Sequence, residues 1–189
     1  MAIDLRKGQT LNLQPSSAAG LGDILVNLSW NSRGFRGPID LDLACMYELN
    51  NGMKGVVQAL GNAFGSKFTP PYIMLDGDDR SGLGGENLYI NGNMVSQIKR
   101  ILVFTFIYDG VANWQQANAV VTIRYPGAQD IIVRLDEYYS SQTVCALAMF
   151  RNINNVTFNV EKLVQFYPSH QVLDQAFGWN LPWVLGRKD

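Results

Sequence analysis

Short runs in which apolar and polar residues alternate dominate the chain and predict β-strands. Eight segments rich in β-branched and aromatic residues carry this pattern, and glycine, proline or asparagine turns separate them. They span residues 23–30, 39–49, 72–75, 98–108, 119–125, 130–135, 144–152 and 156–166. One or two further strands are expected around residues 3–5 and 10–13. Asn50-Asn51-Gly52 and Asn154-Asn155 are typical of hairpin turns.

Helical periodicity is scarce and is confined to residues 112–118 and 173–178. Many short strands with frequent turns predict an all-β fold, a sandwich of two antiparallel sheets with one or two short helical segments. The run 101–108, Ile-Leu-Val-Phe-Thr-Phe-Ile-Tyr, is apolar on both faces. We therefore expect it to be a central strand covered on both sides, within a single domain over residues 1–189.

Composition and charge narrow the class of protein. Hydrophobic residues make up 47% and charged residues 16% of the 189 residues, which is enough apolar material for a sizeable core. The net charge is −1 and the basic residues are scattered, so no nucleic-acid partner is expected. The first residues lack an apolar signal-peptide core, and no apolar run approaches the ~20 residues that span a bilayer. We expect a soluble, cytoplasmic protein in which Cys45 and Cys145 are buried, reduced thiols.

The stretch 76–86 concentrates carboxylates and glycines. Its acids are Asp76, Asp78, Asp79 and Glu86, it contains four glycines, and Arg80 is its one basic residue. Neighbouring carboxylates repel each other, and glycines raise the entropy cost of ordering the backbone. A hard divalent cation offsets both costs, because it neutralises the acids and accepts backbone carbonyls as ligands. The stretch matches neither the EF-hand pattern nor a phosphate-binding loop.

Three further acids lie at predicted strand ends. Asp40 and Asp42 alternate with Ile39, Leu41 and Leu43, so they share one face at a spacing of roughly 6.6–7 Å. They are either ligands of an ion or two solvated acids on an exposed face. Asp109 ends the long apolar run, where it is either a ligand or a turn-forming residue. If these strand ends meet the loop at one edge of the sandwich, seven acids form one cluster: Asp40, Asp42, Asp76, Asp78, Asp79, Glu86 and Asp109.

Enzymatic interpretations find little support in the residues. His170 is the single histidine, which excludes a zinc site built from several histidines, and a structural or surface role is expected for it. No Gly-x-Ser-x-Gly nucleophile elbow is present. A carboxylate pair acting as general acid and base remains open. The glycine-rich and turn settings of the acids suit oxygen coordination better than catalysis.

Taken together, these segments resemble the tellurite-resistance TerD family. The resemblance rests on residues 5–9 (Leu-Arg-Lys-Gly-Gln), 26–30 (Val-Asn-Leu-Ser-Trp), 39–44 (Ile-Asp-Leu-Asp-Leu-Ala), 77–82 (Gly-Asp-Asp-Arg-Ser-Gly) and 106–109 (Phe-Ile-Tyr-Asp). The Asp-Leu-Asp pair combined with this loop is specific. Within the family the chain looks closest to the TerA-like branch.

The resemblance implies a calcium-binding β-sandwich linked to resistance against tellurite and other chemical stress. By residue matching, Asp40, Asp42, Asp78, Asp79 and Asp109 take the positions of the family's acids or amides in the metal region. Asp76 is proposed as a ligand on the basis of the clustered negative charge alone, and not because it matches a family position. Family members continue the loop as Gly-x-Gly-x-Gly-Asp-Asp-Glu, whereas this chain reads Gly-Leu-Gly-Gly-Glu-Asn over 82–87, with Glu86 as its single acid. We therefore predict one good calcium site and a second that is weaker or absent.

The leading hypothesis is a non-catalytic calcium-binding module that acts with protein partners in a stress-response complex. The first alternative is a metal-dependent hydrolase or phosphoryl-transfer enzyme that uses the same acids with magnesium or manganese. The second alternative is a module that docks on membranes in the presence of calcium, through Arg80, Leu83 and residues 64–68.

Overall fold

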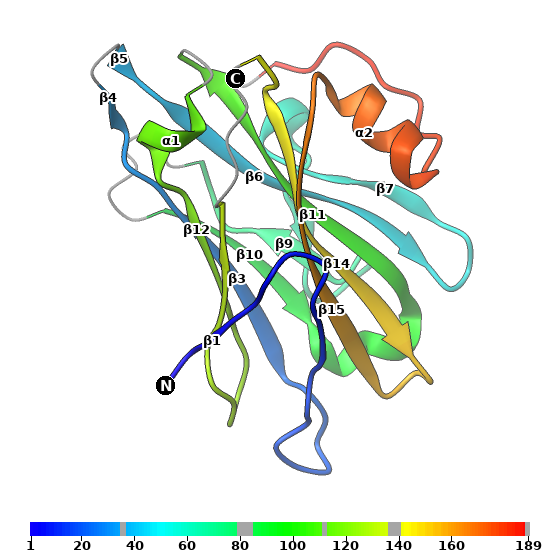
Figure 1. The fold of residues 1–189 in the computed structure, drawn as a ribbon. Coiled ribbons are helices and arrows are strands. Elements are labelled where there is room, and N and C mark those ends of the chain that lie inside the picture. Colours follow the sequence, from blue (N-terminus) through cyan, green and yellow to red (C-terminus); the bar gives the residue numbers. More distant parts are fainter. Residues whose placement is uncertain (35–36, 79–84, 111–112, 136–140, 188–189) are drawn as a thin grey trace.

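Two β-sheets pack face to face in a computed structural model that describes residues 1–34, 37–78, 85–110, 113–135 and 141–187 (Figure 1). The larger sheet has the order β1 (Ile3–Asp4), β13 (Ile131–Arg134), β12 (Val120–Arg124), β3 (Asp23–Ser29), β10 (Glu86–Asn91), β9 (Ile73–Leu75) and β8 (Gly65–Ser66). The smaller sheet has the order β2 (Thr10–Asn12), β15 (Thr157–Tyr167), β14 (Val144–Ile153), β11 (Ile98–Asp109), β6 (Asp40–Leu49) and β7 (Lys54–Val57). The pairings in both sheets are antiparallel except for β1 with β13. The predicted sandwich is confirmed.

Short connections join some of the neighbouring strands, namely β14 to β15, β6 to β7, β12 to β13 and β8 to β9. The turn after β14 places Asn154 at φ 55° and Asn155 at φ 60°, the left-handed conformation that asparagine tolerates and tight hairpins require. The predicted turn at 50–52 joins β6 to β7. A separate two-stranded sheet, formed by β4 (Arg33–Gly34) and β5 (Gly37–Pro38), directly precedes β6.

The main core fills the space between the two sheets. Alternate residues of β3, namely Ile24, Val26 and Leu28, are fully buried, as period-2 alternation requires for a strand with one face in the core. On β11 the residues facing this core include Ile101 and Val103. Cys45 and Cys145 are buried in the same core and neither is part of a disulfide, as predicted.

A second apolar cluster covers the outer face of the smaller sheet. Its strand residues include Phe104 and Leu102 of β11, and Leu173 and Trp179 cover them. Leu173 belongs to the helix α2 (His170–Phe177), drawn in orange outside the sheet in Figure 1. The prediction of a central strand covered on both faces is confirmed for β11.

The helices are few and short. The helix α1 (Trp114–Ala117) lies within the predicted segment 112–118, and α2 begins three residues before the predicted segment 173–178. Two 3₁₀ turns, η1 (Leu60–Asn62) and η2 (Gly92–Gln97), complete the helical structure of the described residues. Within these ranges, no helix has the length and apolar character to cross a membrane.

Three strands of the two large sheets were not predicted, namely β7, β8 and β10, and neither was the pair β4 and β5. The strands β7 and β8 are short and contain glycine, which weakens the local strand signal. The strand β10 begins with Glu-Asn directly after the glycine-rich stretch, so its start looks like part of the loop.

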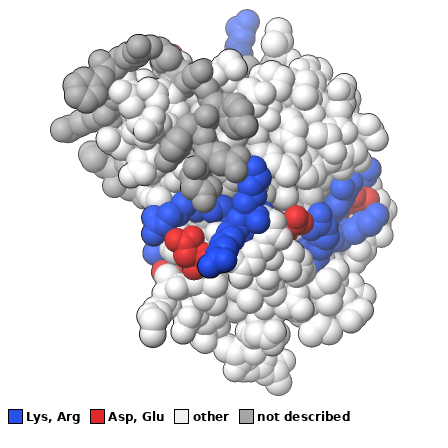
Figure 2. Space-filling model, viewed as in Figure 1, with Lys and Arg blue, Asp and Glu red and all other residues white. Residues whose placement is uncertain are grey.

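Charged side chains of both signs share the surface. Figure 2 shows a band of lysine and arginine side chains across one face, with acidic side chains among them. Ion pairs account for several of the basic residues of β12, β13 and β14. They join Arg124 to Asp130, Arg134 to Asp4 and Arg151 to Glu161. These pairs locally neutralise the basic side chains that take part in them.

Candidate metal centre

Three of the predicted acids meet at one end of the sandwich. Carboxylate oxygens of Asp42, Asp78 and Glu86 all lie within 4.8 Å of one another. Asp42 belongs to β6, Glu86 is the first residue of β10, and Asp78 follows β9. Both sheets and the connection after β9 therefore contribute one carboxylate each.

Glu86 is a strand residue, which corrects the prediction that it belongs to a loop. It shares the inward face of β10 with Leu88 and Ile90, and it is 1% exposed. Its Oε2 atom accepts a hydrogen bond of 2.6 Å from the backbone N–H of Leu43. The strand β7 pairs with β6 only from Cys45 onward, so this N–H lies on a stretch of β6 that β7 does not cover. Glu86 thus ties β10 to the edge of β6.

Asp42 is fully buried, so the interpretation of two solvated acids on an exposed face is wrong for this residue. Leu41 and Leu43 point into the main core, on the face opposite to Asp42. Ala44 and Met46 follow Asp42 on the opposite face and belong to the cluster beneath α2. The outer face of β6 is therefore protein interior, because the chain after β15 returns to cover the smaller sheet.

Asp40 and Asp109 lie opposite each other at the same end of the smaller sheet. The antiparallel register of β6 and β11 pairs the two residues directly. Asp109 is exposed, and its Oδ1 atom accepts a hydrogen bond of 2.8 Å from the N–H of Gly110, which fits the turn-forming alternative. Among the described residues, neither acid belongs to the group formed by Asp42, Asp78 and Glu86.

Asp76 is exposed and takes part in a separate chain of amide side chains. Its Oδ2 atom accepts a hydrogen bond of 3.1 Å from Nδ2 of Asn87. The Oδ1 atom of Asn87 in turn accepts one of 2.8 Å from Nδ2 of Asn27 on β3. Sequence reasoning missed both asparagines, although the alternation of polar and apolar residues over 86–91 was a usable signal. Asp79 lies outside the described residues.

Gly85 explains how Glu86 reaches its position. Its φ is +74°, a conformation that L side chains rarely adopt, and a Cβ atom there would lie 2.2 Å from the backbone oxygen of Leu28. Only glycine allows this close approach of the loop to β3. Gly85, one of the four glycines of the stretch 76–86, is therefore required for the backbone conformation directly before β10.

The grouped residues fit a hard divalent cation. Calcium–oxygen distances of about 2.3–2.6 Å allow two ligands of one ion to be at most about 5 Å apart. Oxygens within 4.8 Å of one another satisfy that limit. Two of the three acids are buried, and buried carboxylates are retained when they are paired or coordinate a metal. Asp42, Asp78 and Glu86 would hold the ion, which would neutralise their charges.

Neither His170 nor the two cysteines belong to the group that Asp42, Asp78 and Glu86 form. His170 is the first residue of α2, and its ring packs against Phe104 and Phe106. Burial lowers its pKa from 6.5 to about 4. Burial also raises the pKa of the Cys45 thiol far above its usual range. A thiol that stays protonated is a poor nucleophile and a poor metal ligand.

Comparisons with known proteins agree with the fold. No protein-family model matches the chain. The two-sheet sandwich is also the fold of SCO6318 from Streptomyces coelicolor A3(2), described as a homologue of telluride resistance protein (TerD). That structure aligns with a TM-score of 0.60 at 20% identity, over 82% of this chain and 95% of SCO6318. The crystal structure of SAV2460, a protein of unknown function, aligns with a TM-score of 0.62 at 18% identity, over the same shares of the two chains.

The comparison of sequences finds a relative among the tellurium resistance proteins. The chain is 41% identical over 183 residues to tellurium resistance protein TerA of an Alcaligenes species. The match covers 90% of this chain and 54% of that protein, so the chain spans about half the length of the relative. The resemblance to the tellurite-resistance proteins, and to the TerA-like branch among them, is confirmed.

Proposed function

We propose that the chain is a non-catalytic calcium-binding module of a tellurium-resistance system. One observation carries the proposal: carboxylates from three separate segments converge within 4.8 Å of one another. The relation to tellurium resistance protein TerA supports the resistance role. Calcium would link β6, β10 and the segment after β9, and thereby order the acidic end for contact with protein partners.

The decisive experiment is calorimetric titration of metal-free protein with calcium. We expect one tight ion per chain. Asp78→Asn and Glu86→Gln each remove one charge and keep the side-chain shape, so each is expected to weaken calcium binding at least tenfold. Asp130→Asn is the matched control, because Asp130 is a partly exposed acid that pairs with Arg124 in the turn after β12.

The metal-free variants distinguish a metal site from a structural acid cluster. Like charges within 4.8 Å repel each other, so a metal-free protein with one carboxylate neutralised should be at least as stable as the wild type. A destabilised Asp78→Asn protein with unchanged calcium affinity contradicts the proposal. Absence of binding heat in the wild type would also contradict it.

Ion preference separates this proposal from the enzymatic alternative. An enzyme that uses the same acids would favour magnesium or manganese and keep positions open for substrate. A higher binding affinity for magnesium than for calcium, together with measurable phosphatase or hydrolase activity, would support the enzymatic alternative. In cells, the module hypothesis predicts that Asp78→Asn lowers tellurite resistance while Asp130→Asn leaves it unchanged.

Asp40 and Asp109 offer a location for a weaker second ion. They face each other across β6 and β11, next to Asp42. Asp109→Asn is expected to remove a weak second binding event and to leave the tight one intact. The same titration checks both events.

A further inference from the structure

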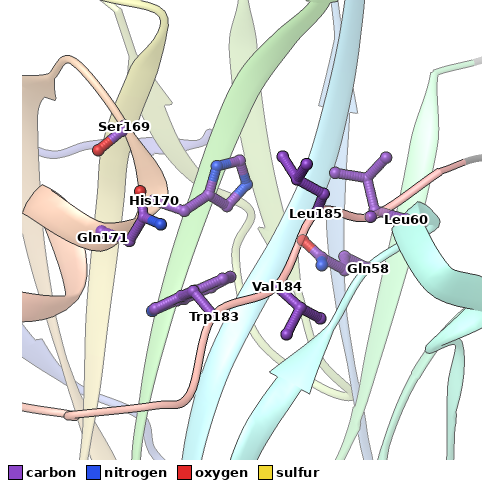
Figure 3. A pocket seen from close by; sticks show the side chains of 9 residues that line it. Gln58, Leu60, Ser169, His170, Gln171, Trp183, Val184 and Leu185 are labelled. Atoms are coloured by element: carbon purple, nitrogen blue, oxygen red, sulfur yellow. The ribbon is translucent and has the colours of Figure 1, made fainter.

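A pocket of about 360 Å³ lies between the C-terminal segment and the smaller sheet (Figure 3). Gln58, His170 and Trp183 are among its nine lining residues, none of which is an acid, a lysine or an arginine. Oε1 of Gln58 and Nε2 of His170 have almost no accessible surface, so a molecule in the pocket does not reach them. The polar side chains that are arranged around a ligand site lie instead beside the acidic group.

Two asparagines and an aspartate form a row of hydrogen bonds beside that group. Asn27 and Asn87 lie directly opposite each other on the outer face of the larger sheet. Nδ2 of Asn27 donates to Oδ1 of Asn87 at 2.8 Å, and Nδ2 of Asn87 donates to Oδ2 of Asp76 at 3.1 Å. The backbone N–H of Asp76 also donates to the backbone oxygen of Asn87 at 3.0 Å. We call Asn27, Asn87 and Asp76 the amide row.

The amide row holds the backbone next to two of the proposed calcium ligands. Asn87 directly follows Glu86, and Asp76 stands two residues before Asp78. Nδ2 of Asn27 also lies 3.5 Å from the backbone oxygen of Glu86, at the outer limit of a hydrogen bond. The start of β10 and the segment after β9 are therefore tied together by side chains that face away from the core.

Strand preference does not explain the two asparagines. Asparagine is depleted in strands, and Asn27 lies in the middle of β3, between Asn87 of β10 and Thr122 of β12. A β-branched residue such as threonine suits this position better. The side-chain hydrogen bonds of the amide row are what asparagine adds at both positions.

We propose that Asn27 and Asn87 are positioning residues of the calcium site. They fix Asp76, and with it the backbone that leads to Asp78, so that the carboxylates of Asp78 and Glu86 converge before an ion binds. Asp76 accepts these hydrogen bonds and is not a ligand of the tight ion. This inference rests on the proposed calcium site.

Reversing the hydrogen bond between Asn87 and Asp76 tests the amide row. Asn87→Asp places a carboxylate oxygen against Oδ2 of Asp76, and the two oxygens repel each other. Calcium affinity, measured by calorimetric titration of the metal-free full chain, should fall about tenfold, the lower end of the effect of residues that orient metal ligands. The double variant Asp76→Asn/Asn87→Asp keeps the net charge and again places a donor against an acceptor. Its carboxylate at position 87 still accepts from Asn27, so most of the lost affinity should return.

Asn159→Asp is the matched control. Nδ2 of Asn159 donates to Oδ1 of Asn12 at 2.8 Å, so the same change is made in an amide pair of the smaller sheet. By strand register Asn159 lies opposite Arg151, and Arg151 lies opposite Arg100, at the end of that sheet away from Asp42. Calcium affinity should be unchanged in this variant.

Asn27→Thr supplies a readout that does not need calcium. Threonine favours strands, so the metal-free variant should be at least as stable as the wild type in denaturant unfolding. Its short hydroxyl cannot make both contacts of the asparagine amide, and calcium affinity should fall about tenfold. A loss of stability in the metal-free variant with unchanged affinity would overturn the inference, because the amide row would then only support the fold.

The remaining results separate this inference from the proposed function. Wild-type protein that does not bind calcium would overturn both. Calcium binding by the wild type, with unchanged or higher affinity in Asn87→Asp, would overturn the inference alone. A double variant that binds as weakly as Asn87→Asp would also overturn it, because Asp76 would then be a ligand.

Discussion

Gly85 is the residue on which the position of Glu86 depends. A Cβ atom at Gly85 would meet the Leu28 backbone oxygen at 2.2 Å, and the φ of +74° already disfavours any side chain. We predict that Gly85→Ala costs about 2 kcal/mol or more in the free energy of unfolding and also weakens calcium binding, because the start of β10 has to shift. Denaturant unfolding and calcium titration measure the two effects.

Gly8→Ala is the control for this prediction. Gly8 has the same φ of +74°, but no atom lies within 4 Å of a Cβ atom there. Its substitution should cost only the conformational penalty of about 1 kcal/mol and leave calcium affinity unchanged. Equal effects of the two substitutions would show that the contact with Leu28 does not position the acid.

His170 makes stability depend on pH. Burial lowers its pKa from 6.5 to about 4 in the folded protein. Below pH 6.5 the unfolded chain binds a proton that the folded protein does not, so stability falls as the pH drops from about 6.5 to about 4. The loss amounts to about 3 kcal/mol at most, by the value of one pKa unit.

Comparison with His170→Gln isolates this effect from the carboxylates. The variant should lose less stability than the wild type between pH 6.5 and pH 4, as measured by denaturant unfolding at each pH. NMR of the wild-type ring should show a titration midpoint near 4. A midpoint above 6 would mean that the ring is open to solvent.

At the scale of elements, the C-terminal segment is attached by polar contacts to the outer face of the smaller sheet. Nη1 of Arg100 donates to the backbone oxygen of Phe177 at 2.9 Å, and Nη2 donates to that of Gly178 at 3.3 Å. Its guanidinium carbon lies 3.6 Å from the ring centroid of Trp179. Nε of Arg100 also pairs with Glu48 at 2.6 Å. One arginine thus joins β11, β6 and the end of α2.

Arg100→Lys is expected to loosen this attachment, because an ammonium cannot reproduce the planar set of donors. We predict a loss of about 1–3 kcal/mol in stability and faster hydrogen exchange over residues 170–183. Arg151→Lys is the control, because Arg151 forms an exposed ion pair with Glu161 on β14 and β15. Equal exchange rates in the two variants would contradict the role of Arg100.

Element prediction succeeded where the signal is local. The long strand β11 has a continuous apolar run, and β6 alternates clearly, so both were predicted nearly to their observed limits. The strand β10 was missed because its first residues, Glu86 and Asn87, are polar and follow a run of glycines. Their strand conformation depends on pairing with β3 and β9, which no local pattern reveals.

At the scale of the whole molecule, calcium should act as a clamp between the sheets. The proposed ligands come from β6 in one sheet, β10 in the other and the segment after β9. Binding to the folded state alone stabilises it by mass action, by about 2.7 kcal/mol at a hundredfold excess over Kd. We predict a rise in melting temperature with calcium and its reversal by EDTA. The Glu86→Gln protein should show a much smaller rise.

The arrangement of the ends also bears on the membrane alternative. Phe68 is exposed, as membrane docking would require. It comes shortly before β9, however, whose first residue Ile73 pairs with Ile90. Ile90 lies near the end of β10 opposite to Glu86, so this pairing does not bring Phe68 close to the acids. Arg80 and Leu83 lie outside the described residues. Liposome co-sedimentation that is unchanged by calcium would agree with the proposed protein-binding module.

The sequence by itself determined the fold class and the identity of the acids. Strand alternation, hairpin turns and the concentration of carboxylates around 76–86 are local properties. They depend on residues that are close in the sequence and can be recognised without knowledge of the tertiary structure. Only the tertiary structure decided that Asp42, Asp78 and Glu86 converge, while Asp40 and Asp109 lie opposite each other across β6 and β11 outside that group. It also decided that Gln58 and His170 share a pocket. Both outcomes follow from strand register and from the return of the C-terminal segment, which bring together residues that no pattern in the chain connects.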